Sequence, residues 1–153
     1  EAMTLSMQEM SDRFELQDLI VGYCYAVDNR DWDALDEYFT QDALIDYSEM
    51  VGVRGGLTEI KQFLVEGLSP ILAYQHAVST TKYAIDGDTA RTKTVCYNPM
   101  TVSQGQSSDT LVFGLWYIHD FIRTEQGWKI SRLYEQKCYR INVPDWLAEQ
   151  LPS

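Results

Sequence analysis

The chain has 153 residues, the size of one domain. Hydrophobic residues make up 45% of the chain and charged residues 23%, which are ordinary globular usages and exclude a disordered chain, a collagen-like fibre and a coiled coil. The 23 Asp and Glu residues outnumber the 12 Lys and Arg residues and give a formal net charge of -11. Such an acidic surface repels phosphate, so we expect no nucleic-acid partner and no docking on an anionic membrane.

The cysteines and the first residues bear on the cellular compartment. Cys24, Cys96 and Cys138 are widely spaced and include no Cys-x-x-Cys pair, which is typical of free thiols in a reducing compartment. The N-terminus lacks the basic stretch and the apolar run of a signal peptide, and no window approaches the roughly 18 apolar residues of a membrane span. We therefore expect a cytoplasmic protein.

The first part of the chain has the spacing of helices. Apolar residues recur every three or four positions from Leu16 to Val27, behind Asp12, a residue type that caps helices. We expect a helix that ends near Asp28, preceded by a flexible N-terminal arm over residues 1–10. Further along, we expect a short helix capped by Asp31, a strand over residues 43–47, and a helix that Thr58 caps and that ends at Leu68.

From residue 74 onward, the pattern changes to long strands. The sequence Asp86-Gly87-Asp88 favours a tight hairpin turn between two such runs, and a second hairpin is expected around residues 124–127. Helices followed by long antiparallel strands indicate a single α+β domain with the helices on one face of the sheet. The expected strands cover residues 74–85, 89–102, 110–123 and 128–143, with a loop over 103–108 and a short helix after Pro144.

Several residues, in this order and spacing, resemble the SnoaL-like branch of the nuclear transport factor 2-like superfamily. They are Tyr23, Asp28, Asp31, Trp32, Leu35, Phe39, Asp42, Ala43, His76 and the run Gly127-Trp128-Lys129-Ile130. The resemblance implies that residues 1–153 form one SnoaL-like domain, a cone in which a strongly curved antiparallel sheet wraps around a long N-terminal helix and encloses an apolar cavity. Within the superfamily, the chain most resembles scytalone dehydratase and bile acid 7α-dehydratase, and more distantly steroid isomerases and polyketide cyclases.

Asp28 and His76 form the sharpest hypothesis for a catalytic pair. An imidazole is a general acid–base near neutral pH, and a carboxylate beside it fixes its tautomer and stabilises the imidazolium. The resemblance implies the same roles, because the dehydratases keep an Asp and a His at these places. The sequence leaves open that Asp28 only ends a helix and that His76 only fills a strand position.

Tyr23 and Tyr47 are predicted to donate hydrogen bonds to a carbonyl or a developing enolate oxygen. Tyr23 matches a tyrosine of both the dehydratases and the steroid isomerases, and Tyr47 matches one of scytalone dehydratase. Tyr47 also stands where the steroid isomerases keep their catalytic aspartate, which disfavours that activity. A purely structural role remains open in a chain with ten tyrosines. We expect the substrate to be bound by Leu19, Asn98, Trp116, Ile118 and Asp120.

The resemblance and these residues together imply a lyase, a dehydratase of secondary metabolism that acts on a small, apolar, cyclic hydroxy-carbonyl compound. His76, held by Asp28, would abstract a proton next to the carbonyl and return it to the departing hydroxyl. We expect no cofactor, since the chain has no glycine-rich phosphate loop, and no metal, since its two histidines are far apart. An isomerase or a polyketide-type cyclase is the alternative among enzymes, and a non-catalytic binding or assembly module is the alternative outside them.

The strand expected over residues 110–123 is apolar on both faces, which predicts self-association. We place Trp116 and Ile118 on the cavity side and the alternate residues on the outer side. Closed two-fold pairing is the commonest arrangement of oligomers, so we expect a homodimer, or a trimer as in relatives of scytalone dehydratase. The outer face and the contact between copies would hold Phe113, Leu115, Tyr117, His119 and Phe121.

Overall fold

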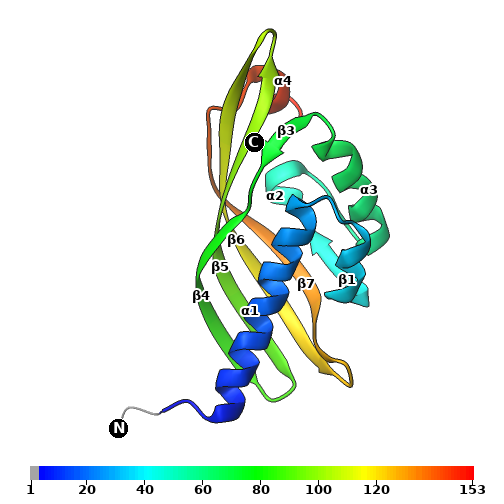
Figure 1. The fold of residues 1–153 in the computed structure, drawn as a ribbon, viewed down its shortest axis with the longest axis vertical. Coiled ribbons are helices and arrows are strands. Elements are labelled where there is room, and N and C mark those ends of the chain that lie inside the picture. Colours follow the sequence, from blue (N-terminus) through cyan, green and yellow to red (C-terminus); the bar gives the residue numbers. More distant parts are fainter. Residues whose placement is uncertain (1–3) are drawn as a thin grey trace.

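A long helix, α1 (Met7–Asp28), lies against a strongly curved sheet (Figure 1). The computed structural model describes residues 4–153. The other helices are η1, a 3-10 helix (Asp33–Glu37), α2 (Ser48–Val51), α3 (Leu57–Leu68) and α4 (Asp145–Ala148). The strands are β1 (Phe39–Asp46), β2 (Arg54–Gly55), β3 (Ile71–Tyr74), β4 (Ala77–Asp86), β5 (Thr89–Gln104), β6 (Ser107–Thr124) and β7 (Gly127–Ile141).

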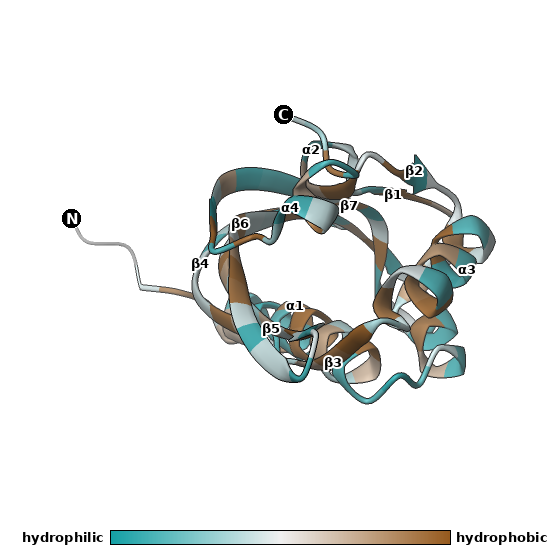
Figure 2. Ribbon diagram, turned by 90° about the horizontal axis from the view of Figure 1, so that it is seen from above, coloured by the Kyte–Doolittle hydropathy of each residue, from teal (hydrophilic) through white to brown (hydrophobic). Residues whose placement is uncertain are grey.

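The strands form one sheet in the order β2-β1-β7-β6-β5-β3, and β4 also pairs with β5. Every neighbouring pair is antiparallel except β1 and β7, which run parallel. The sheet is therefore mixed, whereas a wholly antiparallel sheet was predicted. Tight turns set the directions of β4 to β7, whereas no turn joins β1 to β7. Seen from above, the sheet curls around toward α1 and α3 (Figure 2). The predicted α+β cone with a long N-terminal helix is confirmed.

The long hairpins begin and end near the predicted residues. Gly87 and Gly127 occupy the two predicted turns with φ angles of 60° and 95°, in the left-handed region that glycine adopts without strain. The polar segment over residues 103–108 is not a loop, because β5 and β6 continue through it to a turn at Gly105. These residues are mostly exposed, and the backbone ladder extends the hairpin there together with a hydrogen bond from the Ser107 hydroxyl to the carbonyl of Gln104.

Helix α1 begins earlier than predicted. The hydroxyl of Ser6 accepts a hydrogen bond from the backbone N–H of Glu9, so the helix starts at Met7 and residues 7–10 belong to it and not to an arm. Residues 1–3 of the expected arm lie outside the described residues. The helix ends at Asp28, as predicted. Among residues 4–153, neither α1 nor any other helix is long and apolar enough to cross a membrane.

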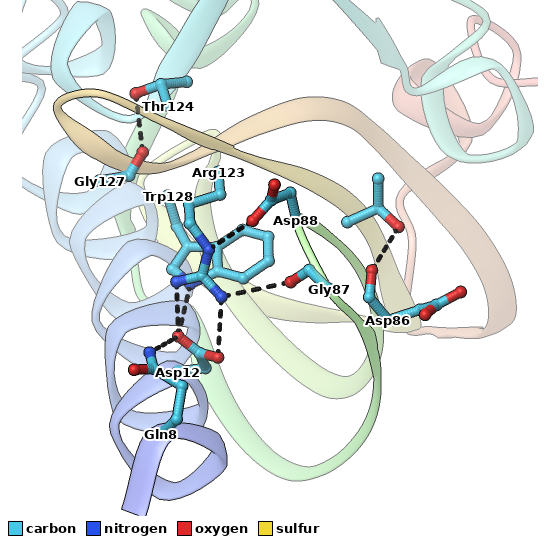
Figure 3. A network of polar contacts seen from close by, with 10 residues as sticks. Gln8, Asp12, Asp86, Gly87, Asp88, Arg123, Thr124, Gly127 and Trp128 are labelled. Carbon is cyan, nitrogen blue, oxygen red and sulfur yellow. Dashed lines mark hydrogen bonds and ion pairs between the residues drawn. The ribbon is translucent and has the colours of Figure 1, made fainter.

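Asp12 is not a helix cap but the centre of a buried polar network (Figure 3). Its carboxylate accepts two hydrogen bonds from the Arg123 guanidinium, at 2.8 and 3.0 Å, and one from the Trp128 indole at 3.0 Å. Gln8 donates a further one from the preceding turn of the helix. The hydrogen bonds from Arg123 hold the pKa of Asp12 well below its usual range. The network ties the start of α1 to the β6–β7 hairpin.

Replacing Asp12 with alanine is expected to lower the free energy of unfolding by about 3 kcal/mol, because the guanidinium and the indole N–H lose their buried partner. Urea denaturation followed by circular dichroism measures the loss. The matched control is Asp88→Ala, since Asp88 bonds the same guanidinium at 3.0 Å from an exposed position. That change should cost less than about 1 kcal/mol. Equal losses for the two variants would contradict a special role for the buried carboxylate.

The prediction placed the wrong face of β6 on the concave side of the sheet. Cys96 of β5 lies directly across from Leu115, Thr94 from Tyr117, and Ala90 from Phe121, and all six side chains are buried. Strict alternation shows which residues share a face but not which face is concave. That choice is set by β5, whose small and buried side chains alternate with exposed charges. Phe113, Leu115, Tyr117, His119 and Phe121 therefore face the core and not a partner.

The predicted pocket residues of β6 lie on the convex face instead. The ammonium of Lys93 lies over the ring of Trp116, 4.5 Å from the ring centroid. Trp116 pairs in register with Val95 of β5. Asp120 forms an ion pair with Arg91 at 2.6 Å. Ile118 shares this face with them by alternation. Leu19, on α1, packs partly buried against the core and contributes nothing to the cavity described below.

Candidate active site

The interior contains a cavity of about 110 Å³ between the concave face of the sheet, α1, α3 and the C-terminal segment. Most of its walls are apolar. The apolar lining includes Val27, Met50, Phe63, Leu64, Met100 and Phe113, and Leu147 and Leu151 close it from the C-terminal segment. The polar lining consists of Tyr23, Tyr47, Tyr74, His76, Asn98, Tyr117 and Glu135. A few polar groups in an apolar enclosure are typical of a site for a small molecule.

Asp28 and His76 form a close pair at the edge of this cavity. His76 Nδ1 lies 2.6 Å from Asp28 Oδ1, and the backbone N–H of His76 donates to Asp28 Oδ2 at 3.0 Å. The side chain of His76 is 10% exposed and that of Asp28 is 21% exposed. The carboxylate thus engages Nδ1 and leaves Nε2 as the ring nitrogen that has no hydrogen-bond partner among residues 4–153. His76 lines the cavity, whereas Asp28 lies behind it and orients it.

Local structure explains how two residues 48 positions apart meet. Asp28 is the last residue of α1, where the helix releases the chain, and His76 lies in the break between β3 and β4. The amide of Asn98 donates to the carbonyl of Gln75 at 2.8 Å, and the Tyr74 hydroxyl donates to the carbonyl of Val27 at 2.6 Å. These bonds fix the backbone on both sides of the pair. Asn98 lines the cavity as predicted, but its amide N–H is used to position the His76 segment.

Tyr23 and Tyr47 meet deeper in the cavity. Their hydroxyls form a short hydrogen bond with each other, and both side chains are buried. Tyr23 projects from α1, and Tyr47 follows the last residue of β1 and precedes α2, a short helix that the sequence did not predict. Burial raises the pKa of each phenol well above its ordinary value, so both stay protonated at neutral pH, and one of the two hydroxyls donates to the other.

Two further polar residues of the cavity were missed, Tyr117 and Glu135. They lie directly across from each other on β6 and β7, and both are buried. The Tyr117 ring is 5.7 Å from that of Tyr23 and 6.4 Å from that of His76. Burial raises the pKa of Glu135 to about 8. Tyr117 could have been found from the alternation of β6 had its concave face been known.

No sequence signal points to Glu135, because a β-bulge puts it there. Counting back from the turn at Gly127 pairs Phe121 with Ile130 and would pair Tyr117 with Tyr134. The register shifts by one residue between Asp120 and Phe121, so that Tyr117 faces Glu135 instead. A shift of one residue moves every following side chain to the other face of the strand. The bulge thereby turns an acidic residue into the cavity.

The other predicted site residues are not brought to the cavity. Leu19, Trp116, Ile118 and Asp120 contribute nothing to its lining, as their places in the fold require. His119 is not an interface residue but is fully buried in the core, where its ring stacks on Phe121 at 5.5 Å. In the part of the chain that the structure describes, no three His, Cys, Asp or Glu side chains gather as metal ligands would.

The chain is similar to a known domain family and to proteins of other organisms. The SnoaL-like domain family matches residues 8–134. An uncharacterized protein of Mycobacterium tuberculosis is 44% identical over 136 residues, which cover 89% of this chain and 92% of that protein.

Two solved structures illustrate the likeness in fold. One is a candidate scytalone dehydratase of Novosphingobium aromaticivorans, with a TM-score of 0.76 and 13% identity over 88% of this chain and 89% of the other. The second is the hexachlorocyclohexane dehydrochlorinase LinA-type3 of Novosphingobium barchaimii, with a TM-score of 0.74 and 18% identity over 89% and 92% of the two chains. At these identities, the likeness establishes the fold.

Proposed function

Because the chain belongs to the SnoaL-like family of the nuclear transport factor 2-like superfamily, we propose that it is a lyase, a dehydratase that acts on a small hydroxy-carbonyl compound. The observation that carries the proposal is the contact of 2.6 Å between Asp28 and His76 at the wall of an apolar cavity that two phenols share. The names of the two structural neighbours support the class, since a dehydratase and a dehydrochlorinase both act by elimination.

The first chemical step is the removal of a proton next to the substrate carbonyl. Nε2 of His76 takes the proton, and the electron pair of the C–H bond becomes the enolate. Asp28 stabilises the imidazolium that forms, because its carboxylate already accepts from Nδ1. Tyr23 and Tyr47 line the same cavity, and because their hydroxyls bond each other, one O–H of the pair is left to donate to the enolate oxygen and lower the barrier.

The second step expels the hydroxyl group. The electron pair of the enolate forms the carbon–carbon double bond as the C–O bond breaks. The imidazolium of His76 returns its proton to the departing oxygen, which leaves as water, and the imidazole is neutral again. One histidine thus serves as base and then as acid, and no further reactant is required.

The lining of the cavity also bears on the substrate. Neither Lys nor Arg is among the described residues that line it, so a carboxylate or phosphate of a ligand would find no cation there. The apolar walls favour a ring of carbon atoms, and the tyrosines favour a neutral oxygen acceptor. We therefore propose an uncharged, cyclic, oxygenated substrate.

Exchange of the α-protons of 1-tetralone in D₂O, followed by NMR, tests the first step without the natural substrate. The wild-type protein is expected to accelerate exchange, and His76→Gln should lower the rate by about 10²–10⁴-fold. His119→Phe, which replaces the other histidine, should retain it. Water loss is tested with 3-hydroxycyclohexanone, which would give 2-cyclohexenone and its ultraviolet absorbance. Exchange without water loss would favour an isomerase or cyclase, and binding without exchange would favour a non-catalytic module.

We also propose self-association, through the convex face of the sheet. On that face, Tyr97 of β5 and Tyr139 of β7 lie on either side of Gly114 of β6, close to Trp116. The two tyrosines are 45% and 43% exposed. Tyr139→Glu is expected to shift light scattering toward the 17.6 kDa of one chain. The control is Phe14→Glu, since Phe14 is 72% exposed on α1 and away from the sheet face. A wild-type mass of 17.6 kDa at all concentrations, or dissociation by the α1 variant only, would contradict this surface.

A further inference from the structure

We infer that Glu135 is a neutral carboxylic acid in the resting protein and donates a hydrogen bond to an oxygen of the ligand in the cavity. The inference deepens the proposed function and rests on it for one point, that the ligand carries a carbonyl oxygen. It assigns to the site a carboxylic-acid donor beside the phenols that line the cavity, and a preference for neutral oxygen acceptors over anions.

Glu135 is buried in the wall of the cavity, where it can contact a ligand. Its side chain is nine-tenths buried and lines the cavity, on the face of β7 that the bulge turns inward. No Lys, Arg or His side chain pairs with it among residues 4–153. A buried carboxylate without a cation is costly, and such a group instead keeps its proton.

Most of the groups around Glu135 also favour the neutral form; the hydroxyl of Tyr117 lowers the pKa of the carboxyl, and burial outweighs that effect. The titratable groups coupled to its charge are Tyr23 and Cys24 of α1, Asp46 and Tyr47 at the end of β1, Cys96 of β5 and Tyr117 of β6. The phenols and thiols are uncharged, since burial raises the pKa of every one of them, that of Cys96 to about 12. Asp46 is the carboxylate of the set, and its charge opposes a second one. The lining from α3 and the C-terminal segment is apolar.

A second observation points to a missing partner in the same place. The hydroxyl of Tyr117, directly across from Glu135, is buried and completes no hydrogen bond within the described chain, although the carboxyl of Glu135 and the thiol of Cys96 are close enough to interact with it. Buried polar atoms are nearly always paired. An acceptor oxygen of a bound ligand would satisfy this hydroxyl and the carboxylic acid together. Charge that develops on that oxygen during reaction would strengthen both bonds.

The test compares 1-tetralone with tetralin, the same bicyclic ring system without the oxygen. At pH 6.5, isothermal titration calorimetry should show that the wild-type protein binds 1-tetralone about tenfold more tightly than Glu135→Leu does. A tenfold difference in affinity is the usual contribution of one hydrogen bond. Glu135→Gln keeps an N–H donor and should stay within about threefold of wild type. Tetralin binding should not weaken in either variant. The carbonyl stretch of bound 1-tetralone should lie at lower wavenumber in wild type than in Glu135→Leu.

The pH dependence separates the acid from its amide analogue. Because the pKa of Glu135 lies at about 8, binding of 1-tetralone to wild type should fall about tenfold between pH 7 and pH 9.5, while binding to Glu135→Gln stays constant. Carboxyl ¹³C NMR of the wild-type protein reads the same titration without any ligand. A Glu135 that is ionised at pH 7 would overturn the inference, and so would equal affinities of wild type and Glu135→Leu for 1-tetralone.

These measurements need no turnover, so they fail separately from the proposed function. If ketone binding depends on Glu135 but the protein exchanges no α-proton, Glu135 is a hydrogen-bond donor and the lyase proposal is wrong. If exchange depends on His76, and Glu135 affects neither exchange nor binding, the lyase proposal stands and the role of Glu135 as a donor is wrong.

Discussion

Asp28→Asn is expected to lower the rate of α-proton exchange by about 10²–10⁴-fold while the fold and the affinity for 1-tetralone stay unchanged. An amide at this position no longer stabilises the imidazolium that forms when His76 takes a proton. It also accepts from Nδ1 through only one of its two polar atoms, which loosens the tautomer that leaves Nε2 free. Asp28 lies behind His76 and not in the cavity lining, so a ligand should not sense the change directly.

The readout that separates this effect from a structural one is the division between binding and rate. Loss of exchange with an unchanged dissociation constant identifies a group that acts through His76. Asp33→Asn is the matched control, because Asp33 is an exposed carboxylate at the start of η1, a few residues further along the chain. Asp28→Asn with full exchange activity would show that the pair is structural and would remove the proposed mechanism.

The sequence was informative wherever a local pattern fixes the outcome. The end of α1 at Asp28 follows from where the apolar periodicity stops, and the turns at Gly87 and Gly127 follow from residue types that tolerate positive φ. His76 and Asp28 were paired through the resemblance to a family, and the structure brings their side chains into contact. Their catalytic roles stay predictions.

The failures share one physical origin, which is that register and curvature are set by contacts distant in the sequence. In β6, residues such as Tyr117 and Trp116 alternate between the two faces, and both faces are apolar, so hydropathy did not say which is concave. The bulge that turns Glu135 inward has no signature in the sequence. Asp12 looked like a cap because its partners, Arg123 and Trp128, are more than a hundred residues away.

Two buried titratable groups should give the protein opposite pH dependences of stability. Burial lowers the pKa of His119 to about 3, and both of its ring nitrogens lack hydrogen-bond partners in the described chain. The unfolded protein therefore binds more protons at this site between pH 3 and 6.5, and stability falls as pH falls through that range. Glu135 behaves oppositely. Its raised pKa means that the folded protein binds more protons between about pH 4.5 and 8, so stability falls as pH rises.

Because the two slopes oppose each other between about pH 4.5 and 6.5, they largely cancel in the wild-type protein, and only the variants reveal them. Glu135→Gln is expected to be more stable than wild type, by a margin that grows from near zero at pH 4.5 to on the order of 4 kcal/mol above pH 8. His119→Phe should gain stability below pH 6.5 and show no such gain at pH 9. Urea denaturation of the three proteins at pH 4.5, 6.5 and 9 measures both margins.

A Glu135→Gln variant that is no more stable than wild type at pH 9 would mean that the native carboxylate is accommodated when charged, contrary to its burial without a cation. A stability gain joined to a loss of pH-dependent ketone binding would instead identify Glu135 as a group that the fold retains at the expense of stability for the sake of its site.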